Sequence, residues 1–486
     1  MVEGQEKYDI IPCVMPNAVS ARVNFLINEV RHLIHQKLKI EMDFLIKFAQ
    51  AHETFRVPEI EALALVEGLD MKIVDYSQDS PFCIVHLDSV ESAKRLAKRS
   101  ILIQSIHELW GKGSTLDVLH ESVKTNTSHV WDSYLGKSFK FDVDPYQGTR
   151  SAKKRIELIN SFRFLGWTGP VKMTNPDNLF TIFEMWPYNS VPLNIPDPTM
   201  MYLARHVGNS SRELLVKFDL KKRGYISTTS MDSELALVTA NLALAAPGKL
   251  FYDPFVGTGS FPIACAHFGA LAFGSDIDGR SIRGEGGNKS LKGNFDQYGI
   301  GSCLGDVFSA DLTNTPIRRH LRTWDGIVCD PPYGVREGLR VLGLRDPEKT
   351  PCRSICAFAD YRRKPTYVPP KKPYSFLVML DDILTFAAET LVDEGRLSFW
   401  MPTANDEDQE IPVPSHPYMG VVSVCTQPFN KWSRRLITYR RLPDSQVSQE
   451  ALEAYTNRQK LTLDGTSADE LNPFRRGYFK KFEAEE

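Results

Sequence analysis

Long apolar runs are missing from this 486-residue sequence, and no stretch approaches the roughly 20 residues that a membrane-spanning helix requires. The longest candidate, at 236–246, is interrupted by Thr239 and Asn241, so we interpret it as a buried helix. The first residues also lack the basic start and the apolar stretch of a secretory signal. These absences predict a cytoplasmic protein with no membrane segment.

Cysteine is scarce, with eight residues scattered over the chain. Several stand inside apolar runs, as Cys329 does, which is typical of reduced core thiols rather than of a disulfide framework. Cys352 and Cys356 are the only close pair, and no second Cys/His pair stands at the spacing of a zinc site. We therefore expect no disulfide and no metal site.

An excess of positive charge over the whole chain is also missing, since the net charge is −2. Only the local distribution of charge can therefore indicate nucleic-acid binding. Residues 137–172 contain eight Lys/Arg against three acids, and a helix is expected at 151–162. We predict that this basic stretch contacts RNA, although a merely solvated helix face is the alternative. The predicted RNA contacts are Lys153, Lys154, Arg155 and Arg163.

The length indicates two or three domains. Residues 1–41 match no recognisable pattern and are treated as an extension of unknown role. Residues 42–192 alternate expected strands and helices, which predicts an α+β module, and a group of prolines predicts a linker at 193–228. A second domain is expected at 229–443, followed by a C-terminal tail at 444–486.

Strands and helices alternate regularly in the second domain, which is typical of βαβ units and a parallel sheet. Two late strands are expected to form a hairpin that closes this sheet. We therefore predict the α/β class, with a Rossmann-like domain whose seven-stranded sheet is mostly parallel and has one antiparallel edge strand. The expected strands lie at 249–252, 271–275, near 303, and at 325–329, 396–400, 421–427 and 436–439.

A glycine-containing turn follows the first of these strands, where residues 253–260 read Asp-Pro-Phe-Val-Gly-Thr-Gly-Ser. Backbone without side chains at Gly257 and Gly259 can approach a ligand closely, although a tight turn without a ligand is the simpler alternative. Pro262 stands where the dinucleotide fingerprint has its third glycine, which argues against NAD. The carboxypropyl arm of S-adenosyl-L-methionine needs only a turn of small residues, so S-adenosyl-L-methionine is the expected cofactor.

Acidic residues are expected at the ends of the second and third strands. Asp276 ends the second strand, where a carboxylate can bind the two ribose hydroxyls of a nucleoside. Asp278 is a competing candidate, and a helix N-cap is the alternative role for either acid. Asp306 is expected to follow the third strand, at a position suited to the adenine amino group.

The most specific motif is Asp-Pro-Pro-Tyr-Gly at 330–334, directly after an apolar strand. Pro331 and Pro332 fix φ and remove N–H donors, so rigid carbonyl acceptors stand beside the carboxylate of Asp330. An amino group can bind there, and Tyr333 offers a ring on which a flipped-out base can stack. These four residues are the predicted catalytic set, which acts by positioning an amino nitrogen toward a methyl group and needs no metal or nucleophile.

The carboxylate of Asp330 favours guanine over adenine. Guanine presents N1–H and its exocyclic amino group side by side, whereas adenine presents an acceptor beside its amino donor. The preference is mild, and an adenine N6-methyltransferase, a protein-glutamine methyltransferase and a non-catalytic RNA-binding scaffold stay open as alternatives. The intact Asp-Pro-Pro-Tyr motif argues against the scaffold.

These motifs, together with Thr-Thr-Ser-Met-Asp at 228–232 and Gly-Ser-Asp-Ile-Asp at 274–278, resemble the catalytic subunit of tRNA (guanine(10)-N2)-methyltransferase. The run at 48–59 resembles the start of that subunit, and the resemblance covers about 42–443. It implies a class I methyltransferase domain preceded by a ferredoxin-like region and a THUMP domain that grips tRNA, here at 42–192. The cofactor contacts predicted on this basis are Ser230, Asp253, Phe255, Gly257, Gly259, Asp276 and Asp306.

The resemblance also implies a partner, a small zinc-binding activator subunit that forms a heterodimer with the catalytic chain. We expect this subunit to bind an exposed sheet edge near Cys303, because an open edge strand offers unpaired backbone groups. The expected reaction is methylation of the N2 amino group of a tRNA guanosine.

Overall fold

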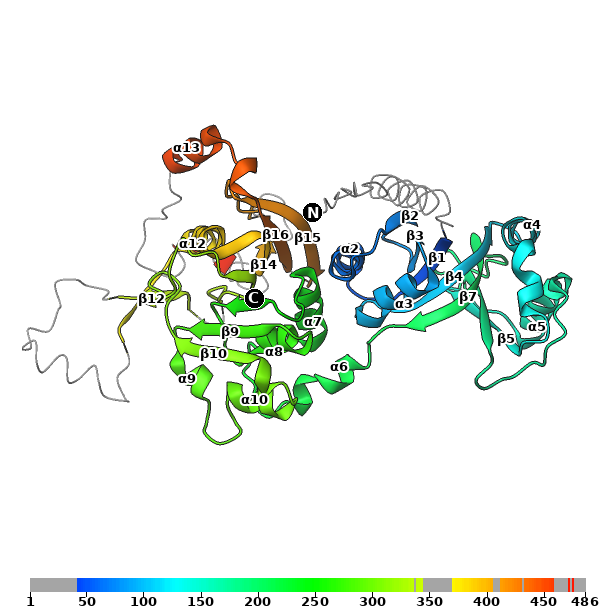
Figure 1. Ribbon diagram of the computed structural model, residues 1–486, viewed down its shortest axis with the longest axis horizontal. Coiled ribbons are helices and arrows are strands. Elements are labelled where there is room, and N and C mark those ends of the chain that lie inside the picture. The colour runs from blue at the N-terminus through cyan, green and yellow to red at the C-terminus, as the bar shows by residue number, and fades with distance from the viewer. Residues whose placement is uncertain are drawn as a thin grey trace, which may run out of the picture.

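The computed structural model describes residues 42–335, 338–343, 369–404, 411–430, 432–458, 471–472 and 474–475. It contains two seven-stranded sheets, which lie side by side along the longest axis of the molecule (Figure 1). The predicted extension at 1–41, the pair Cys352 and Cys356, and much of the predicted tail lie outside the described residues. No helix in the described ranges is long and apolar enough to cross a membrane.

The N-terminal sheet has the strand order β2-β3-β1-β4-β7-β6-β5 and is antiparallel except for the parallel pair β5 and β6. Helix α3 packs against β4 and β7, and α2 packs against α3. The strands are β1 (Met42–Phe48), β2 (Lys72–Tyr76), β3 (Phe82–Leu87), β4 (Ile103–Gly113), β5 (Phe139–Tyr146), β6 (Asn178–Met185) and β7 (Met200–Asn209). The helices of eight or more residues are α2 (Arg56–Glu67), α3 (Val90–Arg99), α4 (Leu116–Thr127) and α5 (Ala152–Asn160).

The segment 193–228, which was predicted as a linker, is only partly a linker, because it contains the strand β7. This strand pairs with β4 on one side and β6 on the other, so Leu203 and Ala204 are completely buried. The prolines that suggested a linker belong to the connection between β6 and β7. The N-terminal module therefore continues through β7 before the short helix α6 (Leu214–Lys217) leads to the second sheet (Figure 1).

The second sheet has the order β10-β9-β8-β11-β14-β16-β15, with parallel pairing from β10 to β14. The predicted α/β class and mostly parallel seven-stranded sheet are confirmed. The antiparallel strand, β16, is not the edge as predicted, because β15 pairs with its outer side. The strands are β8 (Leu250–Asp253), β9 (Leu271–Asp276), β10 (Leu304–Ser309), β11 (Trp324–Cys329), β14 (Leu391–Ala404), β15 (Met419–Pro428) and β16 (Trp432–Arg441).

Helices cover both faces of this sheet, as expected for a doubly wound fold. One buried cluster joins α12 to Ile327 and Phe399, and another joins α7 and α8 to Val328 and Trp400. The helices are α7 (Ser233–Leu242), α8 (Ser260–His267), α9 (Gly279–Arg283), α10 (Leu291–Gln297), α12 (Phe376–Thr390) and α13 (Gln449–Asn457). A small hairpin of β12 (Arg340–Leu342) and β13 (Lys371–Pro373) follows the loop after β11.

The two modules share one hydrophobic core. The buried cluster that contains Phe44 and Leu63 of the N-terminal module also contains Leu235 of α7 and Trp400 of β14. At the junction the ring of Phe55 stacks on Trp400 with centroids 5.8 Å apart. This shared core holds the N-terminal module in a defined place beside the second sheet.

Candidate active site

The glycine-containing turn connects β8 to α8 and uses backbone that favours glycine. Gly257 and Gly259 have φ of 50° and 89°, in the left-handed region. A Cβ on Gly259 would lie 3.1 Å from the side chain of Leu291, so a larger residue would crowd Leu291 in addition to straining the backbone. A Cβ on Gly257 would meet only the carbonyl of Phe255, at 4.0 Å, so space is open in front of this residue. A ligand can therefore approach the backbone of the turn at Gly257.

Asp276, at the end of β9, holds this turn by hydrogen bonds. Its Oδ2 accepts from the backbone N–H of Gly257 at 3.0 Å, and its Oδ1 accepts from the N–H of Asp278 at 2.8 Å. The hydroxyl of Ser230 lies 2.8 Å from the hydroxyl of Thr258. The structure thus brings the predicted residues of three separate segments together around one turn.

Asp253 is the innermost acid of the site, with 1% of its surface exposed. Its Oδ1 accepts from the backbone N–H of Phe255 at 2.9 Å. Burial raises the pKa of Asp253 well above its usual value, and the nearby carboxylates of Asp276 and Asp330 raise it further. A ligand group that carries positive charge is favoured near such a cluster of carboxylates.

Asp330 enters this site because β8 and β11 are parallel neighbours, paired through Phe251 with Gly326 and Tyr252 with Ile327. The carboxyl ends of β8, β9 and β11 therefore point to the same edge of the sheet, which is where open α/β sheets bind ligands. Asp330 is half-buried and Pro331 is buried directly after β11. The glycine-containing turn and the Asp-Pro-Pro-Tyr loop thus stand on adjacent strands.

Tyr333 closes the loop on itself, since its hydroxyl donates a hydrogen bond to Oδ1 of Asp330. Burial and the charge of Asp330 raise the pKa of Tyr333 well above its usual value, whereas Arg434 opposes the shift. The phenol therefore stays protonated and orients the carboxylate. The ring of Tyr333 meets Trp432 edge to face, with centroids 6.3 Å apart. Trp432 in turn stacks on Phe429, at 4.6 Å.

Comparison with known proteins agrees with this geometry. Family models described as "Tmrp11 THUMP N-terminal domain" and "RMKL-like, methyltransferase domain" match residues 42–212 and 221–340. The tRNA (guanine(10)-N(2))-methyltransferase of Saccharomyces cerevisiae is 44% identical over 402 residues, which cover 82% of this chain and 92% of that protein. The chain belongs to the tRNA (guanine(10)-N(2))-methyltransferase family.

Two further relatives carry the same description. The protein of Schizosaccharomyces pombe is 38% identical over 442 residues, covering 84% of this chain and 91% of that protein. The TRMT11 protein of Homo sapiens is 34% identical over 416 residues, which cover 82% of this chain and 88% of that protein. The predicted THUMP and methyltransferase domains of this tRNA (guanine(10)-N(2))-methyltransferase family member are thereby confirmed, and the first match includes β7.

Asp306 does not lie where the sequence suggested. It is an exposed residue inside β10 rather than after it, and Ser309 is the residue that pairs with Asp276. Asp311 is the acid that follows the strand, where it is buried and accepts from the backbone N–H of Leu342 at 2.7 Å. The expected position at a strand end was wrong because β10 runs further than its short apolar stretch indicates.

Asp278, the competing ribose candidate, takes the alternative role. It is the N-cap of α9 and accepts from the backbone N–H of Arg280 at 3.1 Å. Hydrogen bonding to Arg280 lowers the pKa of Asp278 to about 2. Asp276 therefore remains the acid that faces the glycine-containing turn in this family member.

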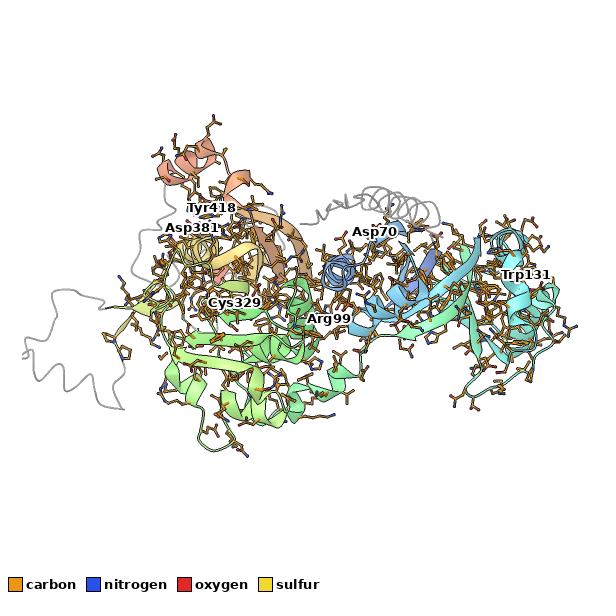
Figure 2. The ribbon with its side chains drawn as sticks, in the orientation of Figure 1. Asp70, Arg99, Trp131, Cys329, Asp381 and Tyr418 are labelled. Atoms are coloured by element: carbon orange, nitrogen blue, oxygen red, sulfur yellow. The ribbon has the colours of Figure 1, made fainter. Side chains whose placement is uncertain are left out.

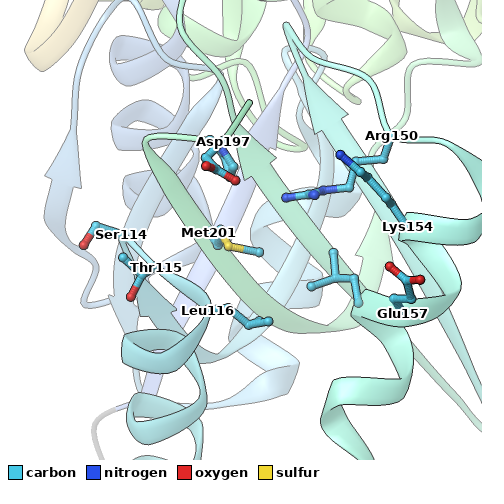
Figure 3. Close-up of a pocket in the computed structure, with 10 residues that line it drawn as sticks. Ser114, Thr115, Leu116, Arg150, Lys154, Glu157, Asp197 and Met201 are labelled. Atoms are coloured by element: carbon cyan, nitrogen blue, oxygen red, sulfur yellow. The ribbon is translucent and has the colours of Figure 1, made fainter. Parts of the chain in front are cut away.

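The predicted RNA contacts lie far from this site, on α5 and the turn after it at the other end of the molecule (Figure 1). All four side chains are exposed, and Lys153 lies 4.0 Å from Glu157 across one helical turn. Next to them is a pocket of about 550 Å³ between α5 and the start of α4, lined by the bases Arg150 and Lys154 and by the acids Glu157 and Asp197 (Figure 3). Arg150 is held in place because its Nε donates to the buried carboxylate of Glu184 at 2.6 Å.

Sequence reasoning missed the aromatic and basic side chains at the turn between β15 and β16. The guanidinium of Arg434 lies over the ring of Trp400 at 4.8 Å, and its Nε donates to Gln427 at 2.5 Å. The concentration of aromatic and basic residues at 429–435 is a signal that could have drawn attention to this turn.

Proposed function

We propose that this chain transfers a methyl group from S-adenosyl-L-methionine to the exocyclic N2 of a guanosine in tRNA, at position 10. The observation that carries the proposal is the placement of the Asp330 loop and the Gly257 turn on adjacent parallel strands. Membership of the tRNA (guanine(10)-N(2))-methyltransferase family supports the choice of substrate.

The residues around the turn fit S-adenosyl-L-methionine. When bound, the cofactor supplies an electrophilic methyl group on a positively charged sulfur. The acids Asp253, Asp276 and Asp330 favour that charge, and the open space at Gly257 admits the carboxypropyl arm. Asp276 ends β9 beside the glycine-containing turn, where a carboxylate can bind the ribose hydroxyls of a nucleoside. The residues proposed to hold the cofactor are Ser230, Asp253, Phe255, Gly257, Gly259 and Asp276.

The catalytic loop acts by holding the amino group. Asp330 accepts hydrogen bonds from the N1–H and N2–H of guanine, while Tyr333 keeps the carboxylate in place and lends its ring to the base. Pro331 and Pro332 keep the neighbouring carbonyls rigid. With its hydrogens bound by these acceptors, the nitrogen directs its lone pair toward the methyl group, and positioning supplies much of the rate.

The N-terminal module is proposed to grip the tRNA acceptor end through phosphate contacts at Lys153, Lys154, Arg155 and Arg163. The pocket beside α5 adds Arg150, whose guanidinium is fixed by Glu184 and therefore loses little freedom on binding an anion. The shared core of the two modules supports this arrangement, because it keeps the basic helix at a set distance from Asp330.

We also propose that the chain acts in the cytoplasm and that a small zinc-binding activator subunit binds along β10. This strand pairs only with β9 among the described strands and has an exposed face, so it offers an open edge beside Cys303. A chain that is monodisperse and fully active when expressed alone would contradict this part of the proposal.

The decisive experiment treats unmodified tRNA with the purified chain, with and without the activator, and with labelled S-adenosyl-L-methionine. Nuclease digestion and mass spectrometry should find N2-methylguanosine, and a transcript with adenosine at position 10 should stay unlabelled. N6-methyladenosine, label in protein, or tRNA binding without methyl transfer would each overturn the proposal in favour of one of the alternatives.

A further inference from the structure

A segment near the end of the chain returns to the Asp-Pro-Pro-Tyr loop. Nδ2 of Asn472 donates to the backbone carbonyl of Tyr333 at 2.7 Å. Nη1 of Arg475 donates to the carbonyl of Gly334 at 2.5 Å and lies 3.5 Å from that of Val335. Asn472 is buried, with 2% of its surface exposed. The carbonyls of two successive residues that end the catalytic motif are thus bound by side chains from this C-terminal segment.

The tail segment is itself fixed in place. Oδ1 of Asn472 accepts from the backbone N–H of Arg475 at 3.2 Å, and the carbonyl of Leu471 accepts from the N–H of Phe376, at the start of α12, at 3.1 Å. Phe474 is buried and packs on Trp432 with centroids 5.7 Å apart. Trp432 also contacts the ring of Tyr333. The C-terminal segment therefore contacts the loop in two ways, by hydrogen bonds to its backbone and, through Trp432, by packing against its tyrosine ring.

Gly334 fits this contact closely. Its φ is 77°, and a Cβ built on it would lie 2.5 Å from Nδ2 of Asn472. A larger residue would therefore strain the backbone and push against the amide end of the Asn472 side chain. The glycine that ends the motif thus has two structural reasons, its left-handed backbone and its close contact with Asn472.

Side-chain donors are needed at this loop because its own backbone supplies few. Pro331 and Pro332 have no N–H groups, so the loop cannot brace itself with an ordinary turn hydrogen bond at those positions. Inside the loop, the hydroxyl of Tyr333 binds Asp330. Outside it, Asn472 and Arg475 bind the carbonyls of Tyr333 and Gly334.

We propose that Asn472 and Arg475 are positioning residues for methyl transfer. They hold the backbone after Pro332 so that Asp330 and the ring of Tyr333 face the base, and neither touches the reacting atoms. This inference rests on the proposed catalytic role of Asp330 and Tyr333. A misplacement of about 1 Å at a reacting group can cost on the order of 10²-fold in rate, so the loss of either clamp should slow the chemical step.

Two substitutions in the full-length chain test the inference. Asn472→Asp keeps the size and the acceptor for Arg475 but places a carboxylate oxygen against the carbonyl of Tyr333. Arg475→Met keeps the apolar stem and removes both donors, and it serves if the first variant does not fold. Each should lower kcat for tRNA methylation about tenfold or more. KM for tRNA and the affinity for S-adenosyl-L-methionine should change less than about twofold.

The matched control is Arg458→Met, which removes another contact of the C-terminal region, the ion pair between Arg458 and Asp381 of α12 at 2.7 Å. Its kcat should equal that of the unmodified chain. Arg475→Lys should recover part of the rate, because it restores one donor. In an Asp330→Asn background Arg475→Met should have little further effect, since residues that act as a unit are non-additive.

An unchanged kcat in Arg475→Met would overturn the inference. So would a parallel loss of kcat, cofactor affinity and melting temperature, because that pattern indicates a purely structural role. Failure of the proposed function is separate, since it appears in the unmodified chain as methylation of another acceptor or of none. If the unmodified chain methylates another acceptor, the kcat values of the variants are compared with that acceptor. If it methylates none, the proposed positioning role is overturned together with the proposed reaction.

Discussion

Asp330 is the residue on which the proposed chemistry depends most directly. Asp330→Asn keeps size and fold but replaces one carboxylate oxygen by an amide nitrogen. An N–H donor of the protein then lies opposite an N–H donor of guanine, and no hydrogen bond forms between them. We expect turnover to fall on the order of 10²-fold or more, while the affinity for S-adenosyl-L-methionine barely changes. Single-turnover methylation of tRNA measures this. Some activity should remain, because the amide can rotate its oxygen toward one donor, and Asp330→Ala should be slower still.

A result within about threefold of the unmodified chain, with normal binding of tRNA and cofactor, would show that Asp330 is not the acceptor of the amino group. The hydroxyl of Tyr333 makes the comparison informative, because it donates to Oδ1 of Asp330. In the variant this hydroxyl can still donate to the amide oxygen, so the loop itself should keep its shape.

His107 is a residue whose burial makes stability depend on pH. It lies inside the N-terminal sheet with its ring 5.1 Å from that of His206, and 4% of its surface is exposed. Burial lowers the pKa of His107 well below 6.5, and the neighbouring His206 and Lys47 lower it further. The unfolded chain therefore binds a proton near pH 6 that the folded chain does not. The stabilisation is fully present above about pH 6.5 and is lost as pH falls.

His107→Gln removes the side chain that takes up this proton when the chain unfolds. Thermal unfolding between pH 7.5 and pH 5 should show a shallower fall of stability in the variant, by up to about 1.4 kcal/mol per pH unit for one proton. Equal slopes for both proteins would contradict the assignment. Two half-buried histidines, His267 and His416, also have lowered pKa values, so the variant should keep part of the dependence.

At the scale of elements, α5 is the candidate for phosphate contacts. Neutralising Lys153, Lys154 and Arg155 together should weaken tRNA binding and reduce the slope of log affinity against log salt, because fewer counterions are released. These side chains are exposed, so stability should change little. Binding isotherms at several salt concentrations make the measurement. An unchanged slope would mean that α5 is only a solvated face of the module.

The elements that sequence reasoning found are those whose local chemistry is distinctive. The turn at 253–260 and the motif at 330–334 could be predicted because glycine and proline restrict the backbone in ways that few other residues do. β7, which lies in the segment predicted as a linker, could not, since it is a central strand of an antiparallel sheet and its partner β4 is distant in the sequence. Propensity alone does not indicate such pairing.

The same reason explains what was missed at the site. The contact between Asn472 and Tyr333 joins residues that are 139 positions apart, and no local sequence pattern predicts it. Asp306 was misplaced because strand ends are the least certain feature of a sequence-based assignment. Asp276 and Asp330 were predicted as site residues because the first ends an apolar strand and the second directly follows one, whereas Gly257 was predicted from the glycine-containing turn after β8.

At the scale of the whole molecule, the junction between modules combines apolar packing with a buried polar network. The carboxylate of Glu59 accepts from Asn241 Nδ2 at 2.8 Å and from the backbone of Ile101 and Leu102 at 2.9 Å. Arg99, at the junction in Figure 2, donates from Nε to Asn241 Oδ1 at 3.0 Å. Asn241 thus links an acid and a base of the N-terminal module to α7 of the methyltransferase domain.

We expect this junction to help the enzyme select one nucleotide. If the basic helix holds the tRNA acceptor end and Asp330 acts on one base, the distance between them selects which guanosine reaches the loop. A shared core fixes that distance better than a flexible linker would. The bond between the hydroxyl of Thr54 and the backbone of Thr426 on β15, at 2.9 Å, adds a second tie.

Asn241→Leu tests this coupling, because it keeps the branched shape of the side chain and favours the helix but removes the link. The buried Glu59 then keeps its other donors but loses one, and Nε of the half-buried Arg99 loses its acceptor, at about 1–3 kcal/mol for a buried polar atom left unpaired. We expect a lower melting temperature by calorimetry, and a larger loss in tRNA methylation than in cofactor affinity, since the turn at Gly257 is untouched. The control is Asn457→Leu on exposed α13, the same chemical change without buried partners. If Asn241→Leu melted and methylated tRNA like the control, the polar network would not hold the modules together, and the selection of the nucleotide would have to come from tRNA contacts alone.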